Sequence, residues 1–178
     1  MRCGPSVGVE RGRQLEDRIW RIEVASFAEI AEEFHTRVAR IAWATVASVG
    51  SDGAPRTRIL HPIWEQHIGW IATGRQSHKI RQLQREPRVS LTYWDAEQDN
   101  VHVEAVATIV DDRAVKDRIW DLFVATPPPL GYDPILFWKD GKTDPAFGLL
   151  RLDPTRIELT GLRHRAAGPP LVWRPRRT

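Results

Sequence analysis

The chain has few of the features that would place it in a membrane or outside the cytoplasm. It contains one cysteine, Cys3, among 178 residues, which excludes a disulfide within the chain. No apolar stretch approaches the roughly 18 residues that a membrane-spanning helix needs. The N-terminal segment also lacks the apolar core of a secretory signal peptide. We therefore expect a cytoplasmic protein with no membrane partner.

Positive charge is missing where nucleic-acid binding would need it. The formal net charge is +3, but residues 163–178 carry five arginines and no acid, and residues 1–14 carry a net +2. Residues 15–162 therefore have a net charge of −4. A nucleic-acid-binding domain usually carries a basic face across its folded body. The sequence thus argues against a nucleic-acid partner.

Composition and charge divide the chain into three parts. We expect a leader, partly disordered, over residues 1–23, one folded domain over 24–162 and a basic tail over 163–178. A single domain of this size buries roughly two-thirds of the surface that its unfolded chain exposes. The chain is 42% hydrophobic and 28% charged, which is ordinary for a globular protein.

Local signals predict three helices and a set of short strands. Helices are expected over about residues 27–40, 77–85 and 113–124. Capping residues precede each of them, and Pro87 stops the second. Alternation of apolar and polar residues predicts strands over 42–49, 55–61, 68–73, 88–94 and 101–110, and a final hairpin that turns at Asp153-Pro154. This is a mainly β, α+β fold. Closure into an antiparallel barrel would remove exposed strand edges, although a sandwich of two sheets fits the same pattern.

Residues 126–146 form a long loop with five prolines. Loops of this length are usually functional or cover a site. Trp138 lies in this loop, where it either covers a planar ligand or packs into the core. The loop also offers apolar surface that two subunits can share.

A cluster of polar and cationic residues follows the predicted strand that ends at Thr73. Ser77, His78 and Lys79 begin the next helix, whose first amides lack internal partners and carry partial positive charge. A hydroxyl, an imidazole and an ammonium at such a place suit a phosphate. Arg58, on a neighbouring basic strand, can reach the same anion. An ordinary capped helix with surface cations is the alternative.

The order of the motifs is similar to that of a known family. It runs through Gly53-Ala-Pro55, Arg58-Ile-Leu-His61, Ser77-x-Lys79, Glu86-Pro-Arg-Val-Ser-Leu91, Tyr93-Trp94, the strand over 101–110 and Leu149–Leu159. Over roughly residues 27–162 this order resembles the pyridoxamine 5′-phosphate oxidase-like family of FMN-binding split β-barrels. The resemblance implies a six-stranded antiparallel split β-barrel with an N-terminal helix and two further helices. It also implies a homodimer with FMN at the subunit interface.

The resemblance assigns roles to residues in two groups. Arg58 and Lys79 would hold the FMN phosphate, helped by Ser77 and by His78, which stands where an arginine is commoner. Ile59, Leu60 and His61 would lie along the isoalloxazine, with Thr73 near its edge.

Asn100 matches a polar position that reaches the flavin, where the oxidase has glutamine. It fits an ordinary turn equally well.

One departure from the family argues against pyridoxamine phosphate as the substrate. The vitamin-processing oxidases end with an Arg-Leu-His-type motif that grips the substrate phosphate, whereas this chain has Arg151-Leu-Asp-Pro154, without the histidine. The sequence is more similar to the general stress protein 26-like flavoproteins and the deazaflavin-dependent reductases.

Other chemistry has weaker support. His102 and Glu104 share one strand face but lack a third ligand at usable spacing, so we expect a cross-strand polar pair and no metal site. No Gly-x-Ser-x-Gly motif of a hydrolase is present.

Three functions follow from the resemblance. The first is an FMN-dependent oxidoreductase acting on an unknown small molecule, in which the flavin performs the transfer and no catalytic side chain is assigned. The second is a 5-deazaflavin-dependent reductase, whose coenzyme has a long anionic tail and would need Arg75, Arg81 or Arg85. The third is a non-catalytic module that binds flavin or haem.

Overall fold

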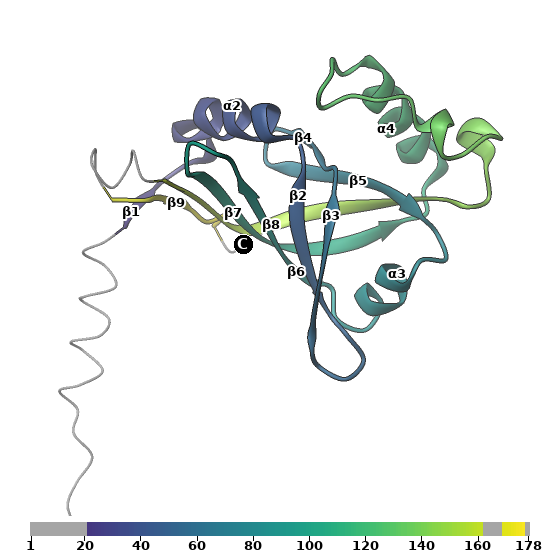
Figure 1. The fold of residues 1–178 in the computed structure, drawn as a ribbon, viewed down its shortest axis with the longest axis horizontal. Helices are drawn as coiled ribbons and strands as arrows, with labels where there is room; N and C mark the ends of the chain where they lie inside the picture. The colour runs from purple at the N-terminus through teal and green to yellow at the C-terminus, as the bar shows by residue number, and fades with distance from the viewer. Residues whose placement is uncertain (1–20, 162–168, 177–178) are drawn as a thin grey trace, which may run out of the picture.

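The computed structural model describes residues 21–161 and 169–176 and is mostly β, with one mixed sheet and three α-helices (Figure 1). The strands are β1 Ile22–Val24, β2 Ala44–Val49, β3 Pro55–Leu60, β4 Ile63–Glu65, β5 Ile68–Gly74, β6 Arg88–Trp94, β7 Asp99–Val110, β8 Phe147–Gly161 and β9 Leu171–Trp173. The helices are α2 Ala31–Ile41, α3 His78–Leu83 and α4 Arg113–Ala125, with 3-10 turns η1 Phe27–Glu29, η2 Pro134–Leu136 and η3 Gly141–Thr143.

The nine strands of the described residues form one sheet that does not close into a barrel. The main path is β1-β9-β8-β7-β6-β2-β3, while β5 pairs with β8 and β4 pairs with β5. All pairs are antiparallel except β1 with β9, so the sheet is mixed. The fold is therefore the predicted α+β type with three helices, but it has nine strands rather than six, and the antiparallel closure is not present.

The predicted hairpin at Asp153-Pro154 is wrong, because β8 runs through this dipeptide as one strand. Its pairing with β7 shifts register there, from Glu104 opposite Arg156 to Ala105 opposite Pro154, so Thr155 is the extra residue of a β-bulge. Proline has no N–H for a ladder bond and is tolerated within a sheet at such a bulge. Pairing with the 12-residue β7 on both sides of the bulge outweighs the local turn preference of Asp-Pro.

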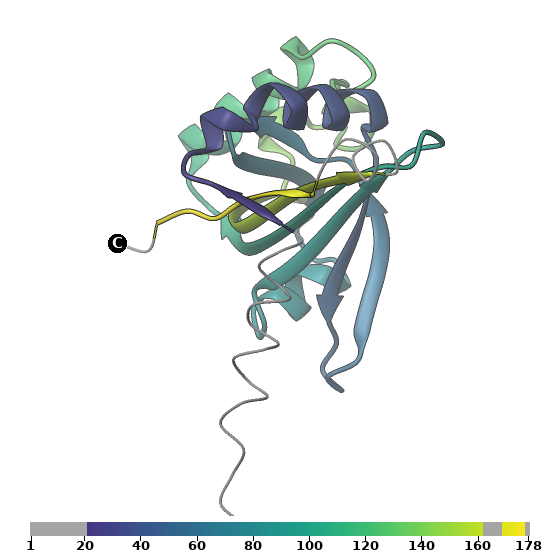
Figure 2. The same ribbon diagram turned by 90° about the vertical axis from the view of Figure 1, so that its left-hand side faces the viewer.

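Two short strands come from the segments that the sequence predicts as leader and tail. Strand β1 lies beside β9, which in turn pairs with β8 (Figure 2). Val172 and Trp173 of β9 are buried, and Trp173 meets the ring of Phe27 edge-on at 5.3 Å. Residues 1–20 of the predicted leader, residue 162 at the end of the predicted domain, and residues 163–168 and 177–178 of the predicted tail lie outside the described residues.

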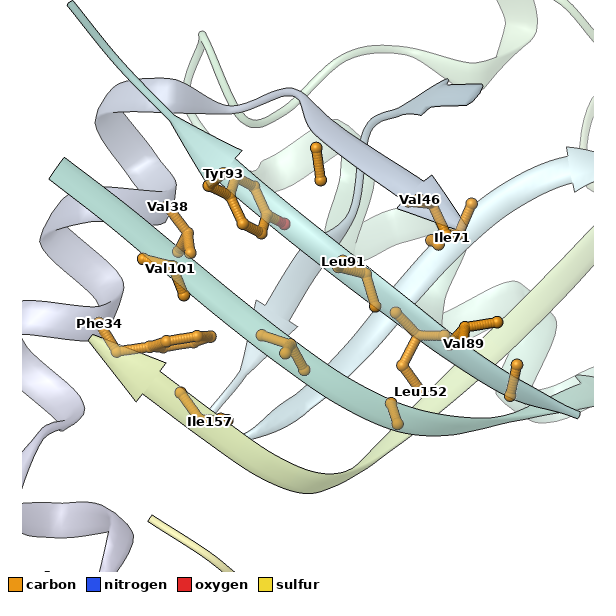
Figure 3. Close-up of a cluster of buried hydrophobic side chains, with 14 of the residues drawn as sticks. Phe34, Val38, Val46, Ile71, Val89, Leu91, Tyr93, Val101, Leu152 and Ile157 are labelled. Carbon is orange, nitrogen blue, oxygen red and sulfur yellow. The ribbon is translucent and has the colours of Figure 1, made fainter. Parts of the chain in front are cut away.

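The main core fills the concave side of the sheet. Phe34 and Val38 of α2 pack there with strand residues such as Leu91 and Val101 (Figure 3). Tyr93 is fully buried, and its hydroxyl accepts a hydrogen bond of 2.9 Å from Trp64 Nε1. This contact satisfies the one polar group that the tyrosine brings into the core.

A second core lies between α4 and the sheet. Ile119 and Phe123 of α4 pack against Trp70 of β5 and Leu149 of β8. Their neighbours Ile71 and Leu150 face the main core instead, because successive side chains of a strand point to opposite faces. Strands β5 and β8 are thus covered on both sides where they pair, which fixes the position of the end of β5.

The predicted helices are confirmed, with small differences at their ends. Ser26 and Glu29 make the expected capping box, and Asp112 Oδ1 accepts a hydrogen bond from the amide of Val115. None of the helices in the described ranges has the length and apolar content needed to cross a membrane.

The buried position of Trp173 leads to a stability prediction. Trp173→Ala should lower the free energy of unfolding by about 3–5 kcal/mol, since it removes a large side chain from the core. Trp94→Ala is the matched control and should cost less than about 1 kcal/mol, because Trp94 is 56% exposed whereas Trp173 is 6% exposed. Urea unfolding followed by circular dichroism measures both values. Equal losses for the two variants would show that β9 is not part of the folded domain.

Candidate functional site

A cavity of about 480 Å³ opens between the end of β3, the end of β5 and the loop that follows α4. Its polar lining consists of His61, Thr73, Tyr132 and Lys79, and its apolar lining includes Trp43, Ile59, Leu60, Leu136, Phe137 and Trp138. Volumes of roughly 300–1,000 Å³ with few polar groups are typical of small-molecule sites. The cavity therefore has the size and composition of a binding site for a largely apolar ligand.

One wall of the cavity is a row of uncharged rings. His61 stacks on Tyr132 with ring centroids 5.3 Å apart, and Trp43 lies 4.6 Å from His61 on a tilted plane. Burial lowers the pKa of His61, with a smaller opposing effect from the backbone of Pro129. Burial also raises the pKa of Tyr132 to about 12. Both rings are therefore neutral at pH 7, and the wall suits a flat aromatic ligand.

The mouth of the cavity is unusually apolar for a surface. Ile59 is 60% exposed and Phe137 is 68% exposed, and Trp43 and Leu136 are also exposed. Ile59 belongs to β3 and Trp43 directly precedes β2, while the other two come from the loop over residues 126–146. Contiguous exposed apolar side chains commonly mark a binding surface.

The cationic end of the site is held by Lys79, the second residue of α3. Its Nζ donates a hydrogen bond of 2.5 Å to Thr73 Oγ1 at the end of β5, and a longer one of 3.4 Å to Ser77 Oγ. The turn between β5 and α3 brings the three side chains together. Burial lowers the pKa of Lys79, and the charge of Arg58 lowers it further. The ammonium is therefore both partly desolvated and repelled by a second cation.

Arg58 is the second cation, on β3. Its Nη1 donates to Ser48 Oγ at 2.8 Å and its Nη2 donates to Gln82 Oε1 at 2.9 Å. Burial lowers the pKa of Arg58 as well. Within residues 21–161 and 169–176, no carboxylate forms an ion pair with Arg58 or Lys79. Two adjacent, partly buried cations without a carboxylate are costly, and an anion bound between them would remove that cost.

The structure brings five of the nine predicted site residues into the cavity lining. These are Ile59, Leu60, His61, Thr73 and Lys79. Ser77 stands at the N-cap position of α3 without a side-chain capping bond and accepts the longer bond from Lys79. Arg58 lies behind the lining, on the side of Gln82.

The other two predicted residues lie outside the lining. His78 is exposed, and its Nδ1 contacts Arg81 at 2.7 Å. Asn100 lies in β7 opposite Trp94, and its side-chain amide donates to the backbone oxygen of Gln98 in the preceding turn. Their roles toward a flavin stay predictions.

Several site residues could not be found from motifs. Ser48 and Gln82 are neutral and common, so nothing in the sequence marks them as neighbours of Arg58. Trp43, Tyr132 and Phe137 join the cavity because a loop folds back over the sheet. The length of that loop and its five prolines indicated that it covers a site, but they did not indicate which of its side chains line that site.

Two further expectations concern charges and metals. Arg75, one of the arginines expected to bind a deazaflavin tail, forms an ion pair of 2.6 Å with Asp111.

His102 contacts Thr92 at 3.2 Å and Glu104 contacts Arg156 at 3.4 Å, which agrees with cross-strand polar pairs. In the described part of the chain, no three His, Cys, Asp or Glu side chains gather in a way that could hold a metal ion.

Comparisons with known proteins give the same answer for fold and family. The sequence model of the family described as Pyridoxamine 5′-phosphate oxidase matches residues 30–161. Among solved structures, the chain is similar to the general stress protein 26 of Bacillus anthracis, with 22% identity, 74% of this chain and 93% of that chain covered, and a TM-score of 0.60.

Two further solved structures are similar. A protein related to general stress protein 26 from Clostridium acetobutylicum has 15% identity, coverage of 82% of this chain and 94% of that chain, and a TM-score of 0.65. A pyridoxamine 5′-phosphate oxidase-related, FMN-binding protein from Nostoc punctiforme has 18% identity, coverage of 79% and 86%, and a TM-score of 0.57. At these identities the structures establish the fold. No curated protein matches the sequence.

The paired cations predict that inorganic phosphate stabilises the protein. At a phosphate concentration about ten times its Kd, the gain is about 1.4 kcal/mol, or roughly 3–5 °C in Tm. Lys79→Ala should lose this gain when ionic strength is matched with chloride. Lys142→Ala is the control, because Lys142 is tied to Asp121 by an ion pair of 2.6 Å. General salting effects act on every variant alike, so an equal Tm rise in all three proteins would argue against an anion site at Lys79.

Proposed function

The chain belongs to the pyridoxamine 5′-phosphate oxidase family, and from this premise we propose that it is an FMN-dependent oxidoreductase acting on an uncharged small molecule. The observation that carries the proposal is the pair of partly buried cations, Arg58 and Lys79, beside a cavity with a wall of neutral rings. FMN combines a doubly charged phosphate with a flat tricyclic ring. The donor set and the cavity match these two parts.

One group of residues would bind the phosphate of FMN by charge and hydrogen bonds, and a second group would pack against its ring. Lys79, Thr73 and Ser77 supply an ammonium and two hydroxyls for a phosphate, and Arg58 adds further charged donors. His61, Tyr132 and Trp43 line the cavity with neutral aromatic side chains, against which an aromatic ring would pack. The bound flavin would supply the hydride or electron transfer. The protein would orient the ring, exclude water with the apolar loop and hold the phosphate.

The proposed substrate is uncharged because the described cavity lining holds no cation beyond Lys79, which the cofactor phosphate would occupy. Lys79 is the only Lys or Arg in the cavity lining of the described residues. Arg151, which stands in the place of the substrate-gripping motif, lies on β8 and forms an ion pair of 2.7 Å with Asp153. This supports a substrate other than a vitamin phosphate.

A 5-deazaflavin coenzyme is the alternative ligand for the same cavity. Its long anionic tail would need arginines beyond the phosphate site. Arg75 is already paired with Asp111, and Arg81 contacts His78. Recruiting Arg75 or Arg81 would break an existing contact, which favours FMN, and the exposed Arg85 is the third candidate for the tail.

We also propose that two copies of the chain form a homodimer across the mouth of the cavity. The exposed apolar side chains there, Trp43, Ile59, Leu136 and Phe137, would be covered by a second subunit. Strand β3 is the free end of the sheet path and borders the same mouth. A closed two-fold pair is the commonest way to cover such a surface.

The dimer proposal predicts a mass of twice 20.4 kDa in sedimentation equilibrium at micromolar concentration. Phe137→Glu should shift the protein toward the monomer, because it places a charge in the apolar contact. Val124→Glu makes the same change at an exposed apolar residue that does not line the cavity and should leave the dimer intact. A parent protein that sediments as a monomer would rule out a cofactor bound between subunits.

The phosphate assignment predicts a selective loss of FMN affinity. Lys79→Ala or Arg58→Ala should weaken FMN about 10- to 150-fold, since each removes a charged hydrogen bond worth roughly 1.5–3 kcal/mol. Riboflavin, which has no phosphate, should bind both variants as it binds the parent. Arg75→Ala should change FMN affinity little, because Arg75 is one of the arginines assigned to a deazaflavin tail and not to the FMN phosphate. Fluorescence titration measures all the affinities. If the parent binds riboflavin as tightly as FMN, the phosphate assignment is wrong.

A further inference from the structure

Arg58 is held by a closed ring of three hydrogen bonds. Its Nη1 donates to Ser48 Oγ at 2.8 Å and its Nη2 donates to Gln82 Oε1 at 2.9 Å. Ser48 Oγ donates in turn to Gln82 Oε1 at 2.8 Å. The three residues come from β2, β3 and α3, and Ser48 is buried. The ring therefore ties the guanidinium to both the sheet and the helix.

The partners of Arg58 orient it without neutralising it. A hydroxyl and an amide are both neutral, so the guanidinium keeps its whole charge. Two of its five N–H donors are used in the ring, which leaves three for a ligand. Had the same position held a carboxylate, a buried ion pair would cancel the charge and compete with any incoming anion. Neutral partners leave the charge of Arg58 available to an anion. A purely structural arginine does not require this.

The same helix face carries Lys79 and Gln82. These residues are three positions apart on α3, which places their side chains next to each other. Gln82 holds Arg58 close enough for its charge to act on Lys79. A displacement of the Arg58 side chain would therefore separate the two cations.

We propose that Ser48 and Gln82 are positioning residues, which hold Arg58 charged and oriented beside Lys79 to bind the phosphate of the cofactor. This inference rests on the proposed function, since it concerns the same phosphate. It extends the site to two neutral residues that touch no part of the ligand and act through Arg58.

The sharpest test replaces the neutral acceptor with a charged one of the same shape. Gln82→Glu keeps an oxygen facing Arg58 and Ser48 but adds a counter-charge. FMN affinity should fall about 10- to 100-fold, riboflavin affinity should not change, and the unfolding midpoint in urea should stay or rise. Gln84→Glu makes the same change of charge at an exposed position of the same helix end and should leave the preference for FMN near the parent value.

A second variant tests whether Gln82 acts through Arg58. Gln82→Leu should weaken FMN in the parent but have little effect in the Arg58→Ala background, because residues that act through one another are not additive. The inference is overturned if Gln82→Leu weakens FMN equally in both backgrounds, or if Gln82→Glu keeps the full preference for FMN over riboflavin. A parent protein without that preference would instead overturn the proposed function, and the positioning role with it.

Discussion

Two cations held side by side without a carboxylate are the constraint around which the site is built. Arg58 and Lys79 are partly buried, and the charge of the first lowers the pKa of the second. Neither pairs with an acid in the described structure, although 23 acidic residues are available in the chain. Such an arrangement is destabilising by itself. A bound anion would neutralise the two cations and remove the cost. A phosphate carries enough charge to do so.

The fold serves to bring these cations to one place. Arg58 comes from β3, at one end of the sheet path, and Lys79 from the helix that follows β5. Strand β8 links the two regions, because its residues 147–152 pair with β5 and its residues 149–161 pair with β7. Strand β7 leads in turn through β6 and β2 to β3. The two cores on either face of β5 and β8 hold the strand end that carries Thr73. The cationic end of the site thus stands on strand ends and a helix, and its apolar mouth joins the β2–β3 side of the sheet to the loop over residues 126–146.

Local signals in the sequence were sufficient for much of this fold. The capping box at Ser26 and the Asp112 cap each act within a few residues, and both stand at the start of a helix that was placed correctly. The prediction failed where distant pairing decides. Asp153-Pro154 prefers a turn locally, yet β7 holds β8 straight through it. Strands β1 and β9 have three residues each and exist because segments about 150 residues apart meet.

The site residues were likewise predictable where local sequence decides and not where distant contacts decide. Charged and hydroxyl residues at the start of α3 were recognisable, since their types suit an anion wherever they gather. Ser48 and Gln82 were not, because only the fold shows what a neutral side chain touches. The ring wall of His61 and Tyr132 was equally hidden, because it joins a strand end to a loop some 70 residues away.

The claim that one phosphate-bearing flavin occupies this site has a direct test. The purified protein is incubated with excess FMN and desalted, and its visible spectrum is recorded together with the mass of the chromophore released on denaturation. The account predicts a flavin spectrum and the mass of FMN, at one molecule per subunit. A deazaflavin mass, a haem spectrum, or a protein that stays colourless after incubation would contradict it.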